Sequence, residues 1–407
     1  MARLLLLLPS ATYKAPDFLD AARRLGAEVV VASDTTQTLA HTMGDRALTV
    51  DLDDPEAAVE AIVESARRRP LDAVVAVDDQ GVLIAALAGA RLGLPHNPAA
   101  AVAATRNKAD MRAALAAAGV RQPDHRTVPA GGDVAAAVRE VGPPVVVKPV
   151  SLSASRGVIR ADSESEAVAA ATRVRAILDD AGRTAGEPLI VERFVPGVEV
   201  AVEALLRGGR LEVLAVFDKP DPLDGPYFEE TIYVTPSRLP APVQERIRAV
   251  TAAAAEALGL REGPVHAELR IDAAGEPWVL ELAARSIGGL CSRSLRFGTG
   301  MSLEEIIVRH ALGLPFDPHR EEAAAGVMML PIGTAGTLRE IRGQEEARAV
   351  PGITELDIGI LPGRPVRPLP EGDRYLGFLF ARADTPEAVE EALRTAHARL
   401  DVLIEPE

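Results

Sequence analysis

Residues 144–159 combine residue types that suit the binding of a polyphosphate. An apolar, β-branched run ends at Lys148, a loop of small hydroxyl residues spans Ser151–Gly157, and a second short β-like run follows. This order predicts a strand, a flexible turn and a returning strand, with a cation at the end of the first strand. Small side chains let the backbone approach a ligand closely, and successive amide N–H groups and hydroxyls can hold phosphate oxygens. The alternative is an ordinary hairpin with a solvated lysine.

A second lysine stands at the start of an expected helix. Asn107 suits the N-cap position of an alanine-rich helix that ends at Gly119. Lys108 then lies in the first turn, where the positive end of the helix dipole disfavours a cation. A cation at this position is explained if it faces an anion. Otherwise Lys108 is a solvated surface residue.

Two glutamates flank a proline–glycine turn further along the chain. A strand ends at Glu192, the turn Pro196-Gly197 follows, and a strand restarts with Glu199. A strand end beside a turn leaves free backbone N–H and C=O groups, which can bind the edge of an adenine ring. Glu199 could accept hydrogen bonds from both ribose hydroxyls. The alternative is a β-turn flanked by exposed glutamates.

Two more glutamates are expected to face each other across a hairpin. The strands 265–271 and 277–282 are joined by a short turn that can place Glu268 opposite Glu281. Opposed carboxylates are destabilising unless a positive group lies between them, and Mg²⁺ takes one or two carboxylates together with phosphate oxygens. Arg285 and a glycine-rich turn follow at once and could hold a phosphoryl group or an oxyanion. The alternative is a pair of solvated glutamates at a strand edge.

Three residues near these groups are candidates for selecting a substrate. They are His266 beside the first hairpin glutamate, Glu229 in the acidic loop Asp221–Glu230, and Arg293 after the glycine-rich turn. His266 is alternatively a packed strand residue. Cys291 has no evident histidine partner and is interpreted as a packed or loop thiol. The low aromatic content of 3% favours a small or polar acyl substrate.

The composition argues against several classes of protein. The formal net charge of −15 argues against nucleic acid and anionic membranes as partners, because both attract basic patches. A single cysteine excludes an internal disulfide framework and indicates a reducing compartment. The apolar run Leu4–Leu8 is shorter than the ~7–15 residues of a signal-peptide core and is ended by Pro9. It is therefore predicted to be a buried strand, and the protein is expected to be cytoplasmic.

The element pattern predicts an α/β protein with an α+β remainder. Strand and helix patterns alternate through residues 1–100, which predicts a doubly wound parallel sheet. Asp78 and Asp79 lie at the carboxyl end of one of its strands, where such sheets bind ligands, although a helix N-cap explains them equally well. Residues 200–282 are mostly antiparallel β in pattern, and a mixed α/β tail begins near Pro315.

Taken in order, these groups resemble the ATP-grasp superfamily over roughly residues 100–300. The resemblance rests on the ordered set Lys108, Lys148 with the loop Ser151–Gly157, Glu192 to Glu199, Glu268, and Glu281 with Arg285. The whole chain is most similar to the L-amino-acid ligase branch of that superfamily. The stretches that resemble the C-terminal domain of this branch are Gly326–Pro331, Leu361–Gly363 and Tyr375–Gly377.

The resemblance implies a doubly wound N-terminal (pre-ATP-grasp) domain, a two-lobed ATP-grasp core and a C-terminal α/β extension. The expected bounds are 1–100 for the N-terminal domain, 101–186 for the first lobe, 187–312 for the second lobe with the metal site, and 313–407 for the extension. The implied reaction is ADP-forming ligation of a small-molecule carboxylate to an amine, on amino-acid-type substrates, through an acylphosphate. A homodimer is common among proteins of this kind.

The same resemblance implies a role for each group. Lys108 and Lys148 would contact the phosphates of ATP, and Ser153, Ser155 and Gly157 would supply donors from the loop above them. Glu192, Phe194 and Val195 would meet the adenine and Glu199 the ribose. Glu268 and Glu281 would hold Mg²⁺, with Mn²⁺ as the alternative ion. Arg285 would stabilise the phosphoryl group and the tetrahedral intermediate.

Some features leave other functions open. Many ATP-grasp enzymes have an asparagine two residues after the second metal glutamate, where this chain has Ala283, so the number of magnesium ions is not defined. The loop is also serine-rich where glycine is common. One alternative is an enzyme that activates bicarbonate or formate, another is a nucleotide-binding scaffold without catalysis, and a third is an ordinary α/β protein with surface charges. The identity of the substrates cannot be deduced from the sequence.

Overall fold

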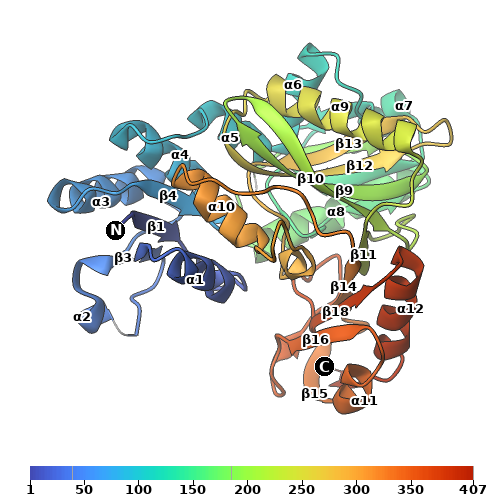
Figure 1. Cartoon of the computed structure of the whole chain (residues 1–407). Coiled ribbons are helices and arrows are strands. Elements are labelled where there is room, and N and C mark those ends of the chain that lie inside the picture. Colours follow the sequence, from blue (N-terminus) through green and yellow to red (C-terminus); the bar gives the residue numbers. More distant parts are fainter. Residues whose placement is uncertain (39, 185, 407) are drawn as a thin grey trace.

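The computed structural model describes residues 1–38, 40–184 and 186–406, and within these ranges it contains four sheets. Residues 39, 185 and 407 fall inside three of the expected domain ranges and lie outside the described residues. Figure 1 shows the N-terminal domain in blue and the C-terminal region in orange to red, joined through a green-to-yellow core. None of the described helices is long and apolar enough to cross a lipid bilayer.

The N-terminal domain is doubly wound, as the sequence predicts. Its four parallel strands are ordered β3-β2-β1-β4. Alternate residues of β1 belong to different cores, because Leu4 packs with Phe18 of α1 while Leu5 packs with Ile62 of α3. The bounds are β1 Arg3–Leu7, α1 Ala15–Arg24, β2 Glu28–Ser33, α2 Ala40–Met43, β3 Ala47–Thr49, α3 Pro55–Arg68, β4 Ala73–Ala76 and α4 Asp79–Leu92.

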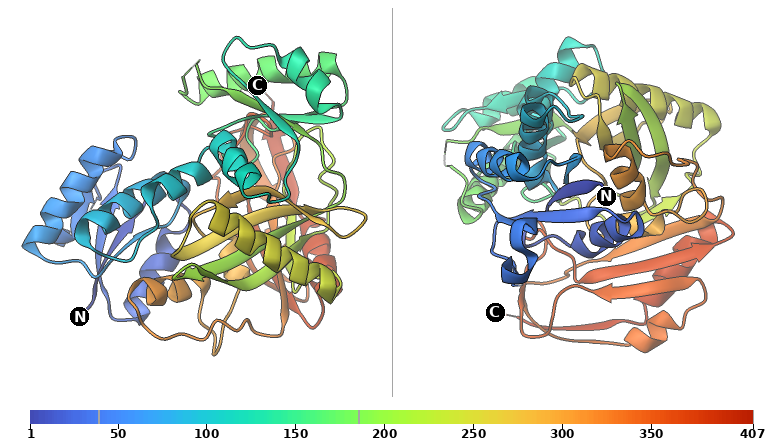
Figure 2. Two further views of the ribbon diagram at one scale, coloured as in Figure 1. Left: turned by 90° about the horizontal axis from the view of Figure 1, so that it is seen from above. Right: turned by 60° about the vertical axis from the view of Figure 1, so that its left-hand side comes forward.

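The first lobe of the core is an antiparallel sheet with the order β5-β8-β6-β7, covered by two helices. The predicted hairpin at Lys148 is confirmed as β6 and β7. Because β8 lies between β5 and β6, this sheet extends to Arg193, beyond the boundary expected at residue 186. The bounds are β5 His125–Val128, α7 Val134–Val141, β6 Val145–Pro149, β7 Ile159–Ala161, α8 Glu164–Asp180 and β8 Leu189–Arg193. The left view of Figure 2 shows this lobe (cyan to green) apart from the blue domain.

The second lobe and the C-terminal region share one sheet of eight strands. The strand order is β13-β12-β9-β10-β11-β14-β18-β16, so the sheet crosses the boundary expected near residue 313 where β11 pairs with β14. Helices α5, α6 and α9 pack on the second-lobe part, although the residues of α5 and α6 were expected in the first lobe. The bounds are α5 Ala99–Thr105, α6 Lys108–Ala117, β9 Val198–Arg207, β10 Arg210–Lys219, β11 Ile232–Thr235, α9 Ala241–Ala257, β12 Gly263–Ile271, β13 Pro277–Ala283, α10 Leu303–Ala311, β14 Ala324–Leu330, β16 Ile353–Ile358 and β18 Gly377–Ala383.

A smaller sheet completes the C-terminal region, with the strand order β17-β15-β19. Helix α12 packs between this sheet and the large one through Val389 and Leu393. The bounds are β15 Gly336–Arg342, α11 Gln344–Arg348, β17 Pro365–Val366, α12 Pro386–His397 and β19 Asp401–Glu405.

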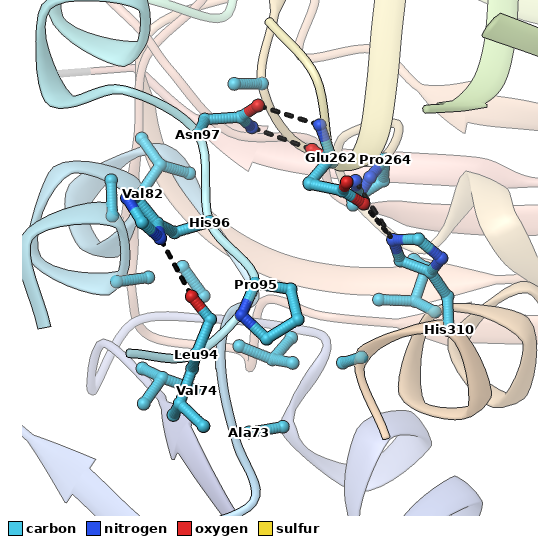
Figure 3. Close-up of a pocket in the computed structure, with 18 of the residues that line it drawn as sticks. Ala73, Val74, Val82, Leu94, Pro95, His96, Asn97, Glu262, Pro264 and His310 are labelled. Carbon is cyan, nitrogen blue, oxygen red and sulfur yellow. Dashed lines mark hydrogen bonds and ion pairs between the residues drawn. The ribbon is translucent and has the colours of Figure 1, made fainter. Parts of the chain in front are cut away.

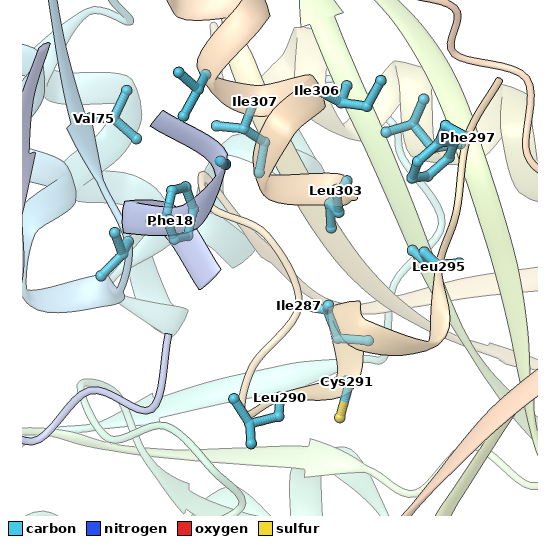
Figure 4. Packing of buried hydrophobic residues seen from close by; sticks show 14 of the residues in the cluster. Phe18, Val75, Ile287, Leu290, Cys291, Leu295, Phe297, Leu303, Ile306 and Ile307 are labelled. Atoms are coloured by element: carbon cyan, nitrogen blue, oxygen red, sulfur yellow. The ribbon is translucent and has the colours of Figure 1, made fainter. Parts of the chain in front are cut away.

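One apolar cluster fixes the N-terminal domain against the core. Phe18 and Val75 of the N-terminal domain belong to the same buried cluster as Ile287, Leu303 and Ile307 of the second lobe (Figure 4). Burial of each large apolar side chain contributes about 1.5–3 kcal/mol. The cluster therefore holds the carboxyl edge of the N-terminal sheet next to the turn that follows β13.

Candidate active site

A cavity between the two lobes brings together most of the predicted nucleotide-binding residues. The predicted residues among its lining are Lys108, Lys148, Ser153, Ser155, Glu192, Phe194, Val195, Glu199, Glu268, Glu281 and Arg285. They come from both lobes and from helix α6, so no single element forms the cavity.

The loop after β6 has two successive non-glycine residues in the left-handed region of the backbone. Its start is fixed where Ser151 donates a hydrogen bond from Oγ to Glu187 at 2.8 Å, and Lys108 Nζ donates to the carbonyl of Leu152 at 2.7 Å. Ala154 and Ser155 both have φ of 55°, which costs roughly 1–2 kcal/mol per non-glycine residue. Such strain is typical of ligand-binding loops, where left-handed residues turn backbone N–H groups into anion-binding concavities.

Replacement of Gly157 by alanine is expected to weaken ATP binding. Gly157 has φ of +72°, and an added Cβ would lie 3.2 Å from Cδ of Pro149, so both strain and crowding would move the loop. A cost of about 1 kcal/mol corresponds to an increase of roughly fivefold in KM for ATP, measured by steady-state kinetics. Gly131→Ala is the matched control, because Gly131 has φ of +73° and nothing within 4 Å. An equal effect of both variants on KM would contradict the assignment of the loop.

A buried ion triad holds Lys148 in place. Arg112 donates to Glu192 from Nε at 2.7 Å and from Nη2 at 3.2 Å, and Lys148 Nζ lies 2.7 Å from the same carboxylate. Burial alone would raise the pKa of Glu192, but the two cations lower it to about 2. Both carboxylate oxygens of Glu192 are bonded to these cations. A contact of residue 192 with a nucleotide base would therefore come from its backbone.

An apolar slot lies at one end of the cavity. The rings of Phe194 and Phe228 are stacked with centroids 6.4 Å apart, and the Arg270 guanidinium lies 4.9 Å from the Phe194 ring. Glu199 beside them receives Lys219 Nζ at 2.7 Å and Arg270 Nε at 3.2 Å. Phe194, Phe228 and Glu199 all line the cavity, and aromatic rings are side chains that can pack against a planar base.

The two hairpin glutamates face each other, as the sequence predicts. Glu268 of β12 pairs with Glu281 of β13 in the strand register. Each has a cation nearby: Lys219 Nζ lies 3.7 Å from Glu268, and Lys108 Nζ lies 3.4 Å from Glu281. Burial would raise the pKa of Glu268, but Lys219, His266 and Arg285 hold it well below its usual range. The two glutamate side chains are 26% and 28% exposed and line the cavity, so a ligand in the cavity can reach them.

A third carboxylate that the sequence analysis did not select belongs to this cluster. Oxygens of Glu199, Glu230 and Glu268 lie within 4.8 Å of one another, and Lys219 contacts all three residues. The lysine supplies the positive charge that opposed carboxylates need.

A second cavity joins the first one at Arg285. The residues shared by the two cavities are Ser153, Ala154, Glu230, Glu268 and Arg285. The Arg285 Nε lies 2.9 Å from Asp79 Oδ2 of the N-terminal domain, and no side-chain cap hydrogen bond is made by Asp78. The remaining lining comes from the N-terminal domain, the second lobe and the C-terminal region, and it includes Tyr13, Cys291, Arg374 and Phe378.

Three protein-family models match the chain in the order of these domains. The ATP-grasp N-terminal domain matches residues 19–96, the ATP-grasp domain residues 141–294, and L-amino acid ligase C-terminal domain 2 residues 328–405. The chain belongs to the ATP-grasp superfamily. Its C-terminal match places it in the L-amino-acid ligase branch.

Individual proteins are also similar to this chain. An alanine–anticapsin ligase of Bacillus subtilis is 28% identical over 275 residues, which cover 63% of this chain and 58% of that protein. The solved L-amino acid ligase from Bacillus licheniformis has 25% identity and a TM-score of 0.81, with coverage of 100% of this chain and 99% of that one. The N5-carboxyaminoimidazole ribonucleotide synthetase from Thermotoga maritima, at 20% identity and a TM-score of 0.73, shares the fold.

The three predicted substrate residues have different positions in the ATP-grasp fold. His266 lines the second cavity, and its Nδ1 lies 3.1 Å from Glu203. It is therefore a packed strand residue that also faces a cavity. Glu229 is not among the described lining residues of either cavity, whereas its neighbour Glu230 lines both. Arg293 lines neither described cavity and instead joins three parts of the chain, through Asp17 at 2.9 Å and Glu355 at 2.6 Å.

The interpretation of Cys291 as a packed thiol agrees with the structure. The thiol is buried, its Sγ lies 3.3 Å from Sδ of Met329, and burial raises its pKa. A thiol with a raised pKa is a poor nucleophile, because the thiolate is the reactive form.

Some site residues were not selected from the sequence, although signals for two of them exist. Arg112 follows Lys108 by four residues, so the helical period places both on one face. Lys219 ends a strand directly before the acidic loop. Asp79 was noted at the carboxyl end of its strand, and the structure places it beside Arg285. Arg374 had no local signal, because it reaches the site only through the packing of the C-terminal region.

Another cavity lies between the N-terminal domain and the second lobe (Figure 3). Its polar groups bond to one another: Asn97 Nδ2 donates to the Glu262 carbonyl at 2.7 Å, and His310 Nε2 lies 3.4 Å from the Glu262 carboxylate. The rest of its lining is mainly apolar. It is separate from the cavities that hold the predicted residues.

Proposed function

We propose that this ATP-grasp protein is an ATP-dependent, ADP-forming carboxylate–amine ligase that acts on amino-acid-type substrates. The observation that carries the proposal is the junction of two cavities at Arg285 and Glu268. One cavity has the lysines, loop and slot that suit a nucleotide, and the other has polar and aromatic side chains that suit small substrates. The names of the related ligases support the same reaction class.

The reaction requires positioning and charge neutralisation more than covalent catalysis. A carboxylate oxygen of the first substrate attacks the γ-phosphorus of ATP, and ADP leaves. The amine nitrogen of the second substrate then attacks the acyl carbon and loses a proton. The acyl C–O bond breaks, and phosphate leaves with the bridging oxygen. Lys108 and Lys148 would neutralise the phosphates, and Arg285 would stabilise charge on the transferred phosphoryl group and on the oxyanion.

Glu268 and Glu281 fit a magnesium site, because each presents exposed carboxylate oxygen to the nucleotide cavity. Bound there, Mg²⁺ would neutralise charge on the β- and γ-phosphates. The variants Glu268→Gln and Glu281→Gln are expected to raise the Mg²⁺ concentration required for half-maximal activity by about tenfold or more. Glu276→Gln in the turn of the same hairpin is the matched control. Unchanged Mg²⁺ dependence in both site variants would contradict this assignment, and titration of Mg²⁺ into the ATP-bound protein gives a readout independent of turnover.

The proposal is tested with purified protein, ATP and Mg²⁺ against the amino acids, singly and in pairs, with bicarbonate as a separate arm. We expect amino-acid-dependent phosphate release, formation of ADP, and a product with the coupled mass of the pair. Phosphate release that requires only bicarbonate would contradict the ligase assignment and would indicate a bicarbonate-activating enzyme. Formation of AMP would contradict the proposed reaction.

A further inference from the structure

A loop of the C-terminal region forms part of the second cavity, the one that the proposed function assigns to the substrates and that is named the substrate cavity. Residues 367–376 connect β17 to β18, and within this loop Asp373, Arg374 and Tyr375 line the second cavity. The nucleotide cavity has no lining from this loop among the described residues. The loop therefore contacts the substrate side of the site and not the adenine side.

The loop is held in a defined position by the first lobe. Gly157 N–H of the phosphate-binding loop donates to the Pro370 carbonyl at 2.9 Å. Arg173 of α8 donates to the Glu371 carboxylate from Nε at 2.6 Å and from Nη2 at 2.9 Å, a two-point contact. At Gly372 an added Cβ would lie 2.1 Å from the Arg367 carbonyl oxygen, so the turn requires glycine. These contacts fix the backbone on the N-terminal side of Arg374.

The charges in the substrate cavity are paired, with one exception. The described charged residues of the lining that have an ionic partner are Asp78 with Lys14, Asp79 with Arg285, Glu230 with Lys219, Glu268 with Lys219, His266 with Glu203, and Asp373 with Arg156. Among the described residues of that lining, Arg374 is the charged group with no ion pair and no hydrogen bond. A cation without a partner, on a fixed loop and beside several carboxylates, is available for an anion of the substrate.

We propose that Arg374 binds a substrate carboxylate that is not activated, namely the free α-carboxylate of an amino acid that supplies the amine. This inference rests on the proposed function. The activated carboxylate must reach the phosphates near Arg285, which lines both cavities, whereas Arg374 lines only the substrate cavity. A carboxylate at Arg374 is therefore kept away from ATP, and it stays free in the product.

Aromatic rings beside Arg374 define the class of the amino acid. The Phe378 ring lies 5.7 Å from that of Tyr13 and 6.1 Å from that of Tyr375, both with edge-on geometry. All three side chains line the same cavity as Arg374. An amino acid whose carboxylate is bound by the guanidinium would place an apolar or aromatic side chain against these rings. The same guanidinium could instead bind a second carboxylate of the acyl donor, so the experiment includes both sources.

The kinetic test uses the variants Arg374→Gln and Arg374→Lys. Arg364→Gln is the matched control, because Arg364 is an exposed arginine of the same region that lines neither cavity and has no side-chain partner among the described residues. We expect Arg374→Gln to raise KM for the amine-supplying amino acid by about tenfold to a hundredfold, with KM for ATP unchanged. Arg374→Lys should restore part of the loss, because lysine keeps the charge without the planar fork.

The carboxamide of the amine-supplying amino acid identifies which carboxylate is bound. The wild type should already have a high KM for this amide, and Arg374→Gln should raise it little further. An equal loss of affinity for the acid and the amide would overturn the proposal. A loss confined to acyl donors with an acidic side chain would overturn the assignment to the amine-side substrate.

A binding measurement separates this proposal from the proposed function. L-Phenylalanine and L-phenylalaninamide are titrated into the full chain with Mg²⁺ and a non-hydrolysable ATP analogue. Binding of the acid that requires Arg374, without turnover of any pair, would refute the ligase and support the carboxylate site. Turnover that does not depend on Arg374, or no binding of the acid, would refute the carboxylate site.

Discussion

Replacement of Arg285 by alanine is expected to lower kcat on the order of 10³-fold. Arg285 lies at the junction of the two cavities. In the proposed reaction a phosphoryl group would pass there from the nucleotide to the substrate. The Arg285 guanidinium is ion-paired to Asp79 at 2.9 Å, so it is held in position before the reaction begins. A preorganised charge acts mainly on the transition state, and the loss should therefore fall on kcat more than on KM for ATP. The measurement is steady-state ADP formation at saturating ATP.

Two further variants make this prediction specific. Arg285→Lys should recover only part of the rate, because an ammonium group cannot reproduce the two-point geometry of guanidinium. Arg293→Gln, eight residues further along the same segment, should keep kcat close to wild type, because Arg293 pairs with Asp17, Glu355 and Asp357 away from the described cavities. Equal losses for Arg285→Ala and Arg293→Gln, or a normal kcat in Arg285→Ala, would contradict the assigned position of the charge. Thermal melting of each variant shows whether it is folded.

The part of the site that follows from local geometry could be predicted from the sequence. Lys148 stands at the end of a β-branched run, and the short turn brings Glu268 and Glu281 to the same part of the hairpin. Their direct pairing also needs the register shift between Glu268 and Leu269, which the length of the turn does not determine. The doubly wound N-terminal domain was predictable too, since its alternating elements are continuous in the chain.

The remaining features depend on packing between distant segments. Glu230 rather than Glu229 lines the cavities, and no period in an irregular loop could have decided between the two. Arg293, like Arg285, is followed by a serine near the glycine-rich turn, but its direction is set by carboxylates of the N-terminal domain and the C-terminal region. Two sheets also cross the expected domain bounds, because β8 pairs within the first-lobe sheet and β14 continues the sheet of the second lobe.

The buried triad of Arg112, Glu192 and Lys148 is expected to be essential for stability as well as for the site. All three side chains are buried, with Arg112 at 0% and Glu192 at 2% relative exposure. Glu192→Gln would leave two buried cations without a counter-charge, which costs about 3–5 kcal/mol of unfolding free energy. Lys148 would also be released from its partner, so KM for ATP should rise. Denaturant unfolding near pH 7 measures the first effect, and steady-state kinetics the second.

The pH dependence of the unfolding free energy tests whether the loss in Glu192→Gln comes from the missing charge. The folded-state pKa of Glu192 is lowered to about 2, so its ionic contribution is fully present above the pKa of the unfolded state and is lost as the pH falls toward 2. The difference in unfolding free energy between wild type and Glu192→Gln should therefore be largest near neutral pH and shrink below about pH 4. Glu140→Gln is the control, because its ion pair with Arg126 at 2.5 Å is as short but exposed, and exposed pairs contribute little. A difference for Glu192→Gln that stays constant down to pH 2 would show that packing, and not charge, makes Glu192 important.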